Sequence, residues 1–300
     1  MTAPIIIFCY NRAAHLRRLI NSLLLNKEAA ESNLYIYADG ARTPGDKDVE
    51  AVQQLIGEIS GFKSVTITRR SQNIGLANNI IKGVSEVLDK HESAIVLEDD
   101  LIATPHLLRY MNEALDFYRD TNAWSIAGYT PNVDIPDGYA SDTYPIMRNC
   151  SWGWATWRNR WQKVDWEVSD FKDFIRNSEQ RNLFDESGSD LSAMLLKQQI
   201  GEIGSWSIRF CYSGFKHNMP TIYPTRSFII NGGADGSGSN VGYTSKYETK
   251  IFEEIDELKF CNDLSINPLI LKSFRKTYNC SVIRRAINWW KRVVFLVVSR

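Results

Sequence analysis

Three consecutive acids, Glu98, Asp99 and Asp100, directly follow the apolar residues 94–97. Adjacent carboxylates repel one another, so a chain that ends a buried strand with three of them must compensate their charge. Three uses are open. The acids could bind a hard divalent cation through oxygen ligands, act as acid–base partners, or form a solvated cluster that a helix dipole stabilises. The apolar run before them favours the first use, because it places them at a strand end where a metal ion would offset the repulsion.

The elements that must position these acids alternate between strand and helix. Four β-rich stretches are each followed by a helical pattern, and the predicted strands are 4–10, 33–39, 64–70 and 93–100. This alternation predicts a parallel, doubly wound α/β sheet. Ligands bind such sheets at the carboxyl ends of the strands. Residues 10–12, Asp39 and the acidic triplet all follow a strand, so we expect them along one edge of the sheet.

The pattern becomes irregular from about residue 124, with short mixed elements and no low-complexity linker. We therefore expect one continuous fold in three parts. Residues 1–123 form the regular α/β half, residues 124–263 form an irregular half built onto the sheet, and residues 264–300 form a basic, mostly helical tail.

Five stretches occur in the order seen in GT-A nucleotide-sugar glycosyltransferases. They are residues 4–24, 34–42, 73–84, 95–105 and 151–161, followed by the glycine-rich residues 231–240. Over residues 4–240 the chain most closely resembles bacterial surface-polysaccharide glycosyltransferases related to the inverting N-acetylglucosaminyltransferase I family. The resemblance implies that the first half binds the nucleotide sugar and the irregular half binds the acceptor and carries the catalytic residues.

The resemblance also implies roles for the acids. The triplet corresponds to the D-x-D element of such enzymes, with Asp100 as the direct ligand of Mn²⁺ or Mg²⁺. Glu98 and Asp99 would orient the ribose or sugar and the water shell of the metal. The metal would act as a Lewis acid on the leaving diphosphate.

Five further positions resemble contacts to the nucleotide. Asn11 and Arg12 look like the nucleotide contacts after the first strand, and Asp39 looks like the acid that recognises the base or ribose. Asn73 and Gly75 resemble the turn that closes over the nucleotide, where glycine permits close backbone approach. The alternatives are a surface charge at a helix start for Arg12 and a turn-forming Asp before Gly for Asp39.

The general base is where the chain departs from the family pattern. Related inverting enzymes often place an Asp directly after a Trp, but here Ser207 follows Trp206. Glu202 and Asp235 are the nearby candidates. We prefer Asp235, because a glycine-rich loop can close over a bound donor. An ordinary Asp-Gly turn is the alternative for Asp235.

Tryptophans in the second half are candidates for gripping a sugar. The chain has nine Trp, and flat indole faces commonly bind saccharides. Trp152, Trp154 and Trp206 are the expected acceptor-side residues. Core packing is the alternative for each of them.

Charge is distributed unevenly along the chain. Its net charge is zero, yet no acid follows Asp263, and the tail carries eight bases. Residues 284–298 form an amphipathic helical pattern with Trp290 on its apolar stripe and Arg285 on its basic face. We expect it to lie on an anionic membrane surface. A helix packed on the domain is the alternative.

The cysteines, the histidines and the N-terminal residues indicate the cellular compartment of the protein. Five scattered cysteines and four isolated histidines show no zinc or disulfide spacing, which fits a reducing cytosol. The N-terminal apolar run is typical of a first core strand, not of a signal peptide. The predicted protein is thus cytoplasmic, peripheral at the inner face of the cell membrane, with no nucleic acid partner.

The predicted activity is inverting, metal-dependent transfer of a hexosyl or N-acetylhexosaminyl group. The donor would be a nucleotide-diphosphate sugar, with UDP as the expected nucleotide, and the acceptor a hydroxyl of a growing glycan or lipid-linked saccharide. Two alternatives stay open: metal-dependent phosphoester hydrolysis, and a non-catalytic sugar-binding protein of the same fold.

Overall fold

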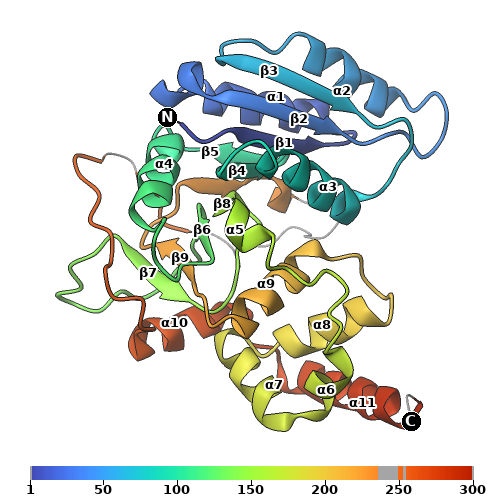
Figure 1. The fold of residues 1–300 in the computed structure, drawn as a ribbon, viewed down its shortest axis with the longest axis vertical. Coiled ribbons are helices and arrows are strands. Elements are labelled where there is room, and N and C mark those ends of the chain that lie inside the picture. The colour runs from blue at the N-terminus through green and yellow to red at the C-terminus, as the bar shows by residue number, and fades with distance from the viewer. Residues whose placement is uncertain (1, 236–248, 253–254, 299–300) are drawn as a thin grey trace.

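A computed structural model describes residues 2–235, 249–252 and 255–298. Within these residues the chain forms one eight-stranded sheet and a two-stranded one, with helices around them (Figure 1). The first four strands of the main sheet are parallel neighbours in the order β3-β2-β1-β4. They are β1 (Ile5–Cys9), β2 (Asn33–Ala38), β3 (Ser64–Arg69) and β4 (Ser93–Glu98). The sequence predicted all four.

Strands from the second half of the chain extend the same sheet. The order after β4 is β8-β6-β9-β7, and β8 pairs antiparallel with β4. These strands are β6 (Ser125–Ala127), β7 (Thr143–Ile146), β8 (Trp154–Trp157) and β9 (Thr221–Pro224). The mixed, mainly parallel α/β architecture confirms the predicted fold class.

Alternating side chains of β1 bury against helices on both faces of the sheet. Ile5 and Ile7 join a core cluster with the first, second and fourth helices, while Ile6 and Phe8 join another with the third and ninth. A strand buried on both faces reads as a continuous apolar run, as residues 5–9 do. These helices are α1 (Ala13–Leu23), α2 (Lys47–Gly57), α3 (Leu76–Leu88), α4 (Leu107–Phe117) and α9 (Trp206–Lys216).

A short second sheet joins two distant segments beside the end of β4. Strand β5 (Leu101–Ala103) pairs antiparallel with β10 (Ile229–Asn231). A 3₁₀ helix, η3 (Gly232–Asp235), follows directly. The glycine-rich segment therefore begins next to the acidic triplet, although more than a hundred residues of chain separate them.

A third cluster of apolar side chains lies among the helices at the lower end of Figure 1. The tail helix α11 packs Phe295 and Leu296 against this cluster. The remaining helices are η1 (Lys27–Glu31), α5 (Arg158–Trp161), α6 (Phe171–Arg176), α7 (Ser178–Phe184), η2 (Asp185–Ser187), α8 (Leu191–Gln199), α10 (Pro268–Tyr278) and α11 (Val282–Val298).

Candidate functional site

Arg12 and the acidic triplet meet at the carboxyl edge of the sheet. Because β1 and β4 are parallel neighbours, the loop after β1 lies beside the end of β4. Arg12 donates from Nη2 to Asp99 Oδ1 at 2.5 Å and from Nη1 to Asp100 Oδ2 at 3.2 Å. The backbone N–H of Tyr10 donates to Asp99 Oδ2 at 3.4 Å. One guanidinium therefore faces two carboxylates.

The acids remain under-compensated even with Arg12 present. Burial, together with the neighbouring charges of Asp100 and Asp99, raises the pKa of Glu98 to about 8. Burial also raises the pKa of Asp99 to about 6, although the Arg12 guanidinium opposes that rise. The arrangement thus favours an additional positive charge beside the triplet.

The geometry around Asp100 fits a divalent cation. Carboxylate oxygens are the ligands that Mg²⁺ and Mn²⁺ prefer. A Cβ atom at Gly233 would lie 2.7 Å from Asp100 Oδ2, so the glycine keeps the space beside that oxygen open. Among the residues that the structure describes, no three His, Cys, Asp or Glu side chains form a complete metal cluster. An ion held by Asp100 would therefore need further ligands that these side chains do not supply, for example diphosphate oxygens or water.

Asp39 organises the turn that contains Asn73 and Gly75. Its Oδ1 accepts the backbone N–H groups of Gly40 and Ile74, and its Oδ2 accepts that of Gly75, each at 3.0 Å. The Asn73 amide donates to Gly40 O at 3.0 Å. The predicted nucleotide-binding residues of the two loops are thus brought together, with Asp39 holding the turn.

Two glycines in this region were not singled out by sequence reasoning. A Cβ atom at Gly40 would lie 2.4 Å from the Gln72 carbonyl carbon, so only glycine lets these two loops touch. Gly233 has the corresponding role beside Asp100. The Asp-Gly and Gly-Gly dipeptides were the available signals, but both also occur in ordinary turns. Gly75 was singled out, and it has the positive φ of 77° expected for its turn.

The remaining predicted polar residues are dispersed. Asn11 is half-buried in the loop between β1 and α1, next to Arg12 at the carboxyl edge of the sheet. Asp235 ends η3, close in sequence to Gly233, and its side chain lies outside the described part of the chain. Glu202 instead forms an ion pair with Lys291 of α11 at 2.6 Å. Its carboxylate thus faces the tail and does not join the acidic triplet.

The three tryptophans divide into core and cavity residues. Trp154 and Trp206 are buried, and their rings stack with centroids 4.8 Å apart. Rings enclosed in this way stabilise the core and leave no free face for a sugar. Trp152 is half-buried, contacts Tyr129, and lines a cavity of about 170 Å³. Of the three, Trp152 alone is partly exposed and lines a cavity.

Residues 5–189 match a known protein family, described as glycosyl transferase family 2. This stretch covers more than half of the chain and contains β1 to β8 together with the acidic edge. The chain belongs to glycosyl transferase family 2. Its α/β architecture is the GT-A fold of that family, and the acidic edge is its candidate active site.

Two solved structures resemble this family 2 chain distantly. TarS of S. aureus, residues 1–349, matches 75% of the chain and 60% of its own length, with 14% identity and a TM-score of 0.41. GalNAc-T7, in a crystal structure with UDP, GalNAc and Mn²⁺, matches 75% of the chain and 42% of its own length, with 10% identity and a TM-score of 0.46. The chain thus spans less than two thirds of either structure, and neither likeness bears on its substrate. No curated protein matches the chain.

Proposed function

We propose that this glycosyltransferase moves a hexosyl or N-acetylhexosaminyl group, with inversion, from a nucleotide-diphosphate sugar to a hydroxyl acceptor. UDP is the proposed nucleotide of the donor. The single observation that supports this best is the meeting of Arg12, the acidic triplet and Gly233 at the carboxyl edge of a family 2 chain.

The donor would lie across this edge. The turn held by Asp39, together with Asn11, would bind the nucleotide, since its backbone approaches the end of β2 closely. Glu98 and Asp99 would orient the ribose or sugar and the water shell of the metal, Asp99 through the Arg12 guanidinium with which it pairs. Arg12 would face the diphosphate, because guanidinium groups pair well with phosphate oxygens.

Asp100 would hold a Mn²⁺ or Mg²⁺ ion beside Gly233. Such an ion supplies Lewis-acid neutralisation of the charge that develops on the leaving diphosphate. Gly233 keeps the Asp100 carboxylate accessible from its open side. Arg12 contacts both aspartates and so holds them in place.

The acceptor would approach from the second half of the chain. We propose Asp235 as the general base, because β10 pairs with β5 and so brings the start of the glycine-rich segment next to Asp100. Such a base typically contributes ~10²–10⁴-fold to the rate. Glu202 is the weaker candidate, since Lys291 holds its carboxylate. Trp152 would contact the acceptor through its half-buried ring.

The biological setting is also part of the proposal. Among the described residues, no helix is both long and apolar enough to cross a bilayer. We propose peripheral contact with an anionic membrane through residues 284–298 at the inner, cytoplasmic face, with no nucleic acid partner. The acceptor would be a growing surface glycan or lipid-linked saccharide. We also propose a relation to bacterial polysaccharide enzymes and the N-acetylglucosaminyltransferase I family, and functional boundaries near residues 123 and 263.

A donor screen tests the proposed reaction. The full chain is incubated with Mn²⁺ and UDP-, GDP-, CDP- and dTDP-sugars, and nucleotide release and thermal stabilisation are measured. We expect one donor class to stabilise the chain, and Asp100→Asn to abolish the metal-dependent part. Asp116→Asn is the matched control, because Asp116 is exposed and pairs with Arg119 on the surface of the chain.

Four outcomes count against the proposal. Stabilisation by none of the nucleotide sugars would exclude the transferase. Phosphoester cleavage without sugar transfer would indicate the hydrolase, and nucleotide-sugar binding without turnover would indicate a binding protein. A rate unchanged by Asp100→Asn would remove this residue from the metal site.

A further inference from the structure

Helix α11 leaves much of its apolar stripe exposed, while two of its arginines line a cavity against the rest of the chain. Ile283, Trp290 and Val297 have exposed fractions of 75%, 61% and 64%. Arg285, Asn288 and Arg292 instead line a cavity between α11 and the rest of the chain. An amphipathic helix docked on a water-soluble protein normally buries its apolar face. In α11 only part of the apolar surface is covered: Phe295 and Leu296 pack on the third cluster, and Val282, Ala286 and Trp289 line the cavity beside the arginines.

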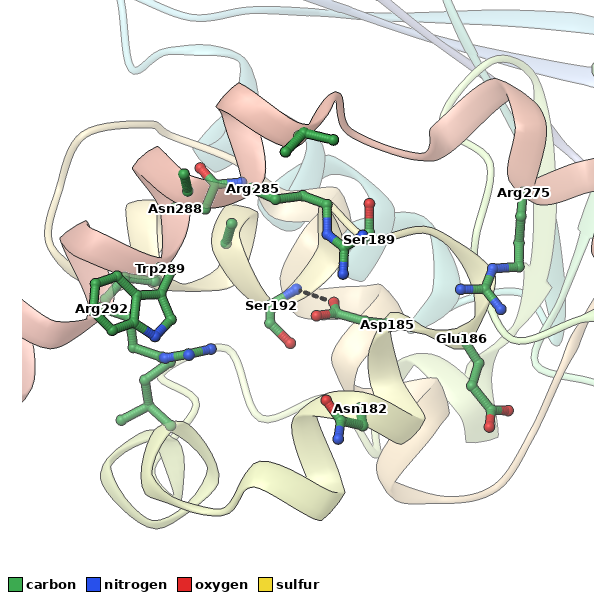
Figure 2. Close-up of a pocket in the computed structure, with 15 residues that line it drawn as sticks. Asn182, Asp185, Glu186, Ser189, Ser192, Arg275, Arg285, Asn288, Trp289 and Arg292 are labelled. Carbon is green, nitrogen blue, oxygen red and sulfur yellow. Dashed lines mark hydrogen bonds between the residues drawn. The ribbon is translucent and has the colours of Figure 1, made fainter.

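The cavity has a volume of about 760 Å³. Figure 2 shows α11 along one side and the segment from Asn182 to Ser192 on the other, with Arg275 of α10 at one end. The guanidinium of Arg285 points into the space above Asp185, and that of Arg292 points in from the end of the helix (Figure 2). The space is large enough for a lipid headgroup or a phosphorylated small molecule.

Three guanidinium groups line this cavity, and Arg292 has the carboxylate of Asp185 as a nearby counter-charge. Within the described ranges, no ion pair or side-chain hydrogen bond engages Arg275, Arg285 or Arg292. The Nε atom of Arg275 and the Oδ1 atom of Asn288 are also buried without a hydrogen-bond partner. Buried polar atoms are normally satisfied, and the Arg275 Nε–H is a donor that an anionic ligand would satisfy, whereas Asn288 Oδ1 is an acceptor that needs a donor such as water.

Two acids line the same space. Asp185 Oδ1 accepts the N–H of Ser192 at 2.7 Å, while Glu186 lies near the rim. Burial raises the pKa of Asp185 to about 6, although the Arg292 guanidinium opposes that rise, and the three guanidinium groups outnumber the two carboxylates. The guanidinium groups therefore dominate the chemistry of the cavity.

We propose that this cavity binds a phosphate group, with Arg285 and Arg292 as its principal partners and Arg275 as a third. Guanidinium groups bind phosphate through two parallel N–H donors, which is why arginine is common in phosphate sites. This site is separate from the acidic edge and is not part of the sugar-transfer chemistry.

The source of that phosphate is the headgroup of an anionic lipid. The exposed stripe of α11 would enter the acyl region, and the bases behind it would then meet the headgroups. This choice of source rests on the proposed membrane contact of residues 284–298. Free phosphate esters share the same chemistry, so the test must separate the two.

The test uses the full chain and two double variants. Arg285→Gln/Arg292→Gln removes two cavity bases, while Lys272→Gln/Arg284→Gln removes two exposed bases from α10 and α11 that do not line the cavity. Sedimentation with phosphatidylcholine vesicles, with and without phosphatidylglycerol, measures lipid binding. Calorimetry with glycerol 3-phosphate and with inorganic phosphate measures binding of soluble phosphate. Thermal unfolding checks that both variants fold.

Each double variant removes two positive charges and so weakens general attraction to an anionic surface equally. Only a further loss of affinity in the cavity variant is evidence for the phosphate site. We expect the cavity variant to bind phosphatidylglycerol vesicles and glycerol 3-phosphate at least about tenfold more weakly than the control variant, because each lost contact is charge-assisted. Equal losses in the two variants, or no binding of either ligand, would overturn the phosphate site.

The remaining outcome separates the two sources. Glycerol 3-phosphate binding that needs Arg285 and Arg292, without vesicle binding, would confirm the phosphate site and overturn the lipid source together with the membrane contact. Nucleotide release at the acidic edge is measured in the same samples. Loss of sugar transfer is therefore distinguishable from loss of the cavity site.

Discussion

Arg12 and Asp99 form the hydrogen-bonded ion pair that joins the loop after β1 to the end of β4, with Nη2 and Oδ1 2.5 Å apart. The aspartate is almost fully buried, whereas the arginine side chain is 26% exposed. The guanidinium therefore compensates the charge of the buried Asp99 carboxylate and stays accessible to a ligand.

Replacing Arg12 by Gln should destabilise the chain. The change leaves the buried Asp99 carboxylate without its counter-ion, which costs about 2 kcal/mol or more. Urea unfolding measures the loss, and Arg18→Gln on the exposed face of α1 is the control. Equal stability of the two variants would contradict a structural role for the pair. Weaker binding of nucleotide sugar by Arg12→Gln alone would support the proposed contact with diphosphate.

Replacing Gly233 by Ala should impair the metal site and spare the fold. The new methyl carbon would lie 2.7 Å from Asp100 Oδ2, so the carboxylate must move. We expect the apparent affinity for the donor in the presence of Mn²⁺ to fall at least about tenfold, as it would on loss of one charge-assisted contact. Thermal stabilisation by increasing concentrations of donor measures that affinity. Gly204→Ala is the control, because a Cβ atom there meets nothing within 4 Å. If Gly233→Ala keeps the wild-type affinity for Mn²⁺, the space beside Gly233 is not needed for metal binding by Asp100.

Replacing Asp39 by Asn should loosen the turn at residues 73–75. Asparagine has one acceptor oxygen where the aspartate uses two, so at least one backbone N–H loses its partner. The expected cost is about 1.5–3 kcal/mol, measured by urea unfolding, with faster hydrogen exchange at Ile74 and Gly75. Exposed Asp137→Asn is the control. If only nucleotide affinity falls and stability is retained, Asp39 acts on the ligand and not on the turn.

Replacing Asp185 by Asn should stabilise the chain at neutral pH. Burial raises the pKa of this carboxyl from its ordinary value of 3.8 to about 6, so the folded state binds the proton more tightly than the unfolded state. The stability that this proton binding contributes is complete below about pH 4 and is lost as the pH rises through 6. A neutral amide at this position carries no such penalty at pH 7.

The measurement is the unfolding free energy of wild type and Asp185→Asn between pH 4 and pH 7. The wild type should lose up to about 3 kcal/mol across this range through Asp185, and the variant should lack that part. The amide oxygen of the new side chain can still accept the Ser192 N–H, so the local hydrogen bond is kept. Asp173→Asn, at an exposed position of α6, is the matched control. Parallel pH profiles for wild type and Asp185→Asn would show that Asp185 has an ordinary pKa.

Sequence pattern was sufficient for the parallel half of the sheet and for the place of the acidic triplet. Residues 5–9 and 94–97 are continuous apolar runs, and such runs bounded by helical patterns predict buried parallel strands. Residues that follow such strands lie at one edge because the strands run in the same direction. Arg12, Asp39 and Asp100 could therefore be selected before their contacts were known.

The amphipathic pattern of residues 284–298 was also apparent, but not the direction in which it faces. Helical periodicity shows that apolar and basic residues lie on opposite sides of α11. The same periodicity is found whether the apolar side or the basic side faces the rest of the chain. The contact of Phe295 with Phe171 of α6 and the ion pair of Lys291 with Glu202 fix the side of α11 that faces the chain, and Arg285 and Arg292 line the cavity there. Only the tertiary structure thus reveals the arginine-lined cavity.

Tertiary packing likewise decided the fate of individual side chains in the second half. Trp152 and Trp154 are two residues apart, yet Trp154 is stacked inside the core and Trp152 reaches a cavity. The pairing of β5 with β10 brings Gly233 to Asp100 across more than a hundred residues. By itself the sequence determined which strands form and where their ends place the acids, because those follow from local periodicity. Which distant segment meets those acids depends on non-local packing, and only the folded structure decided it.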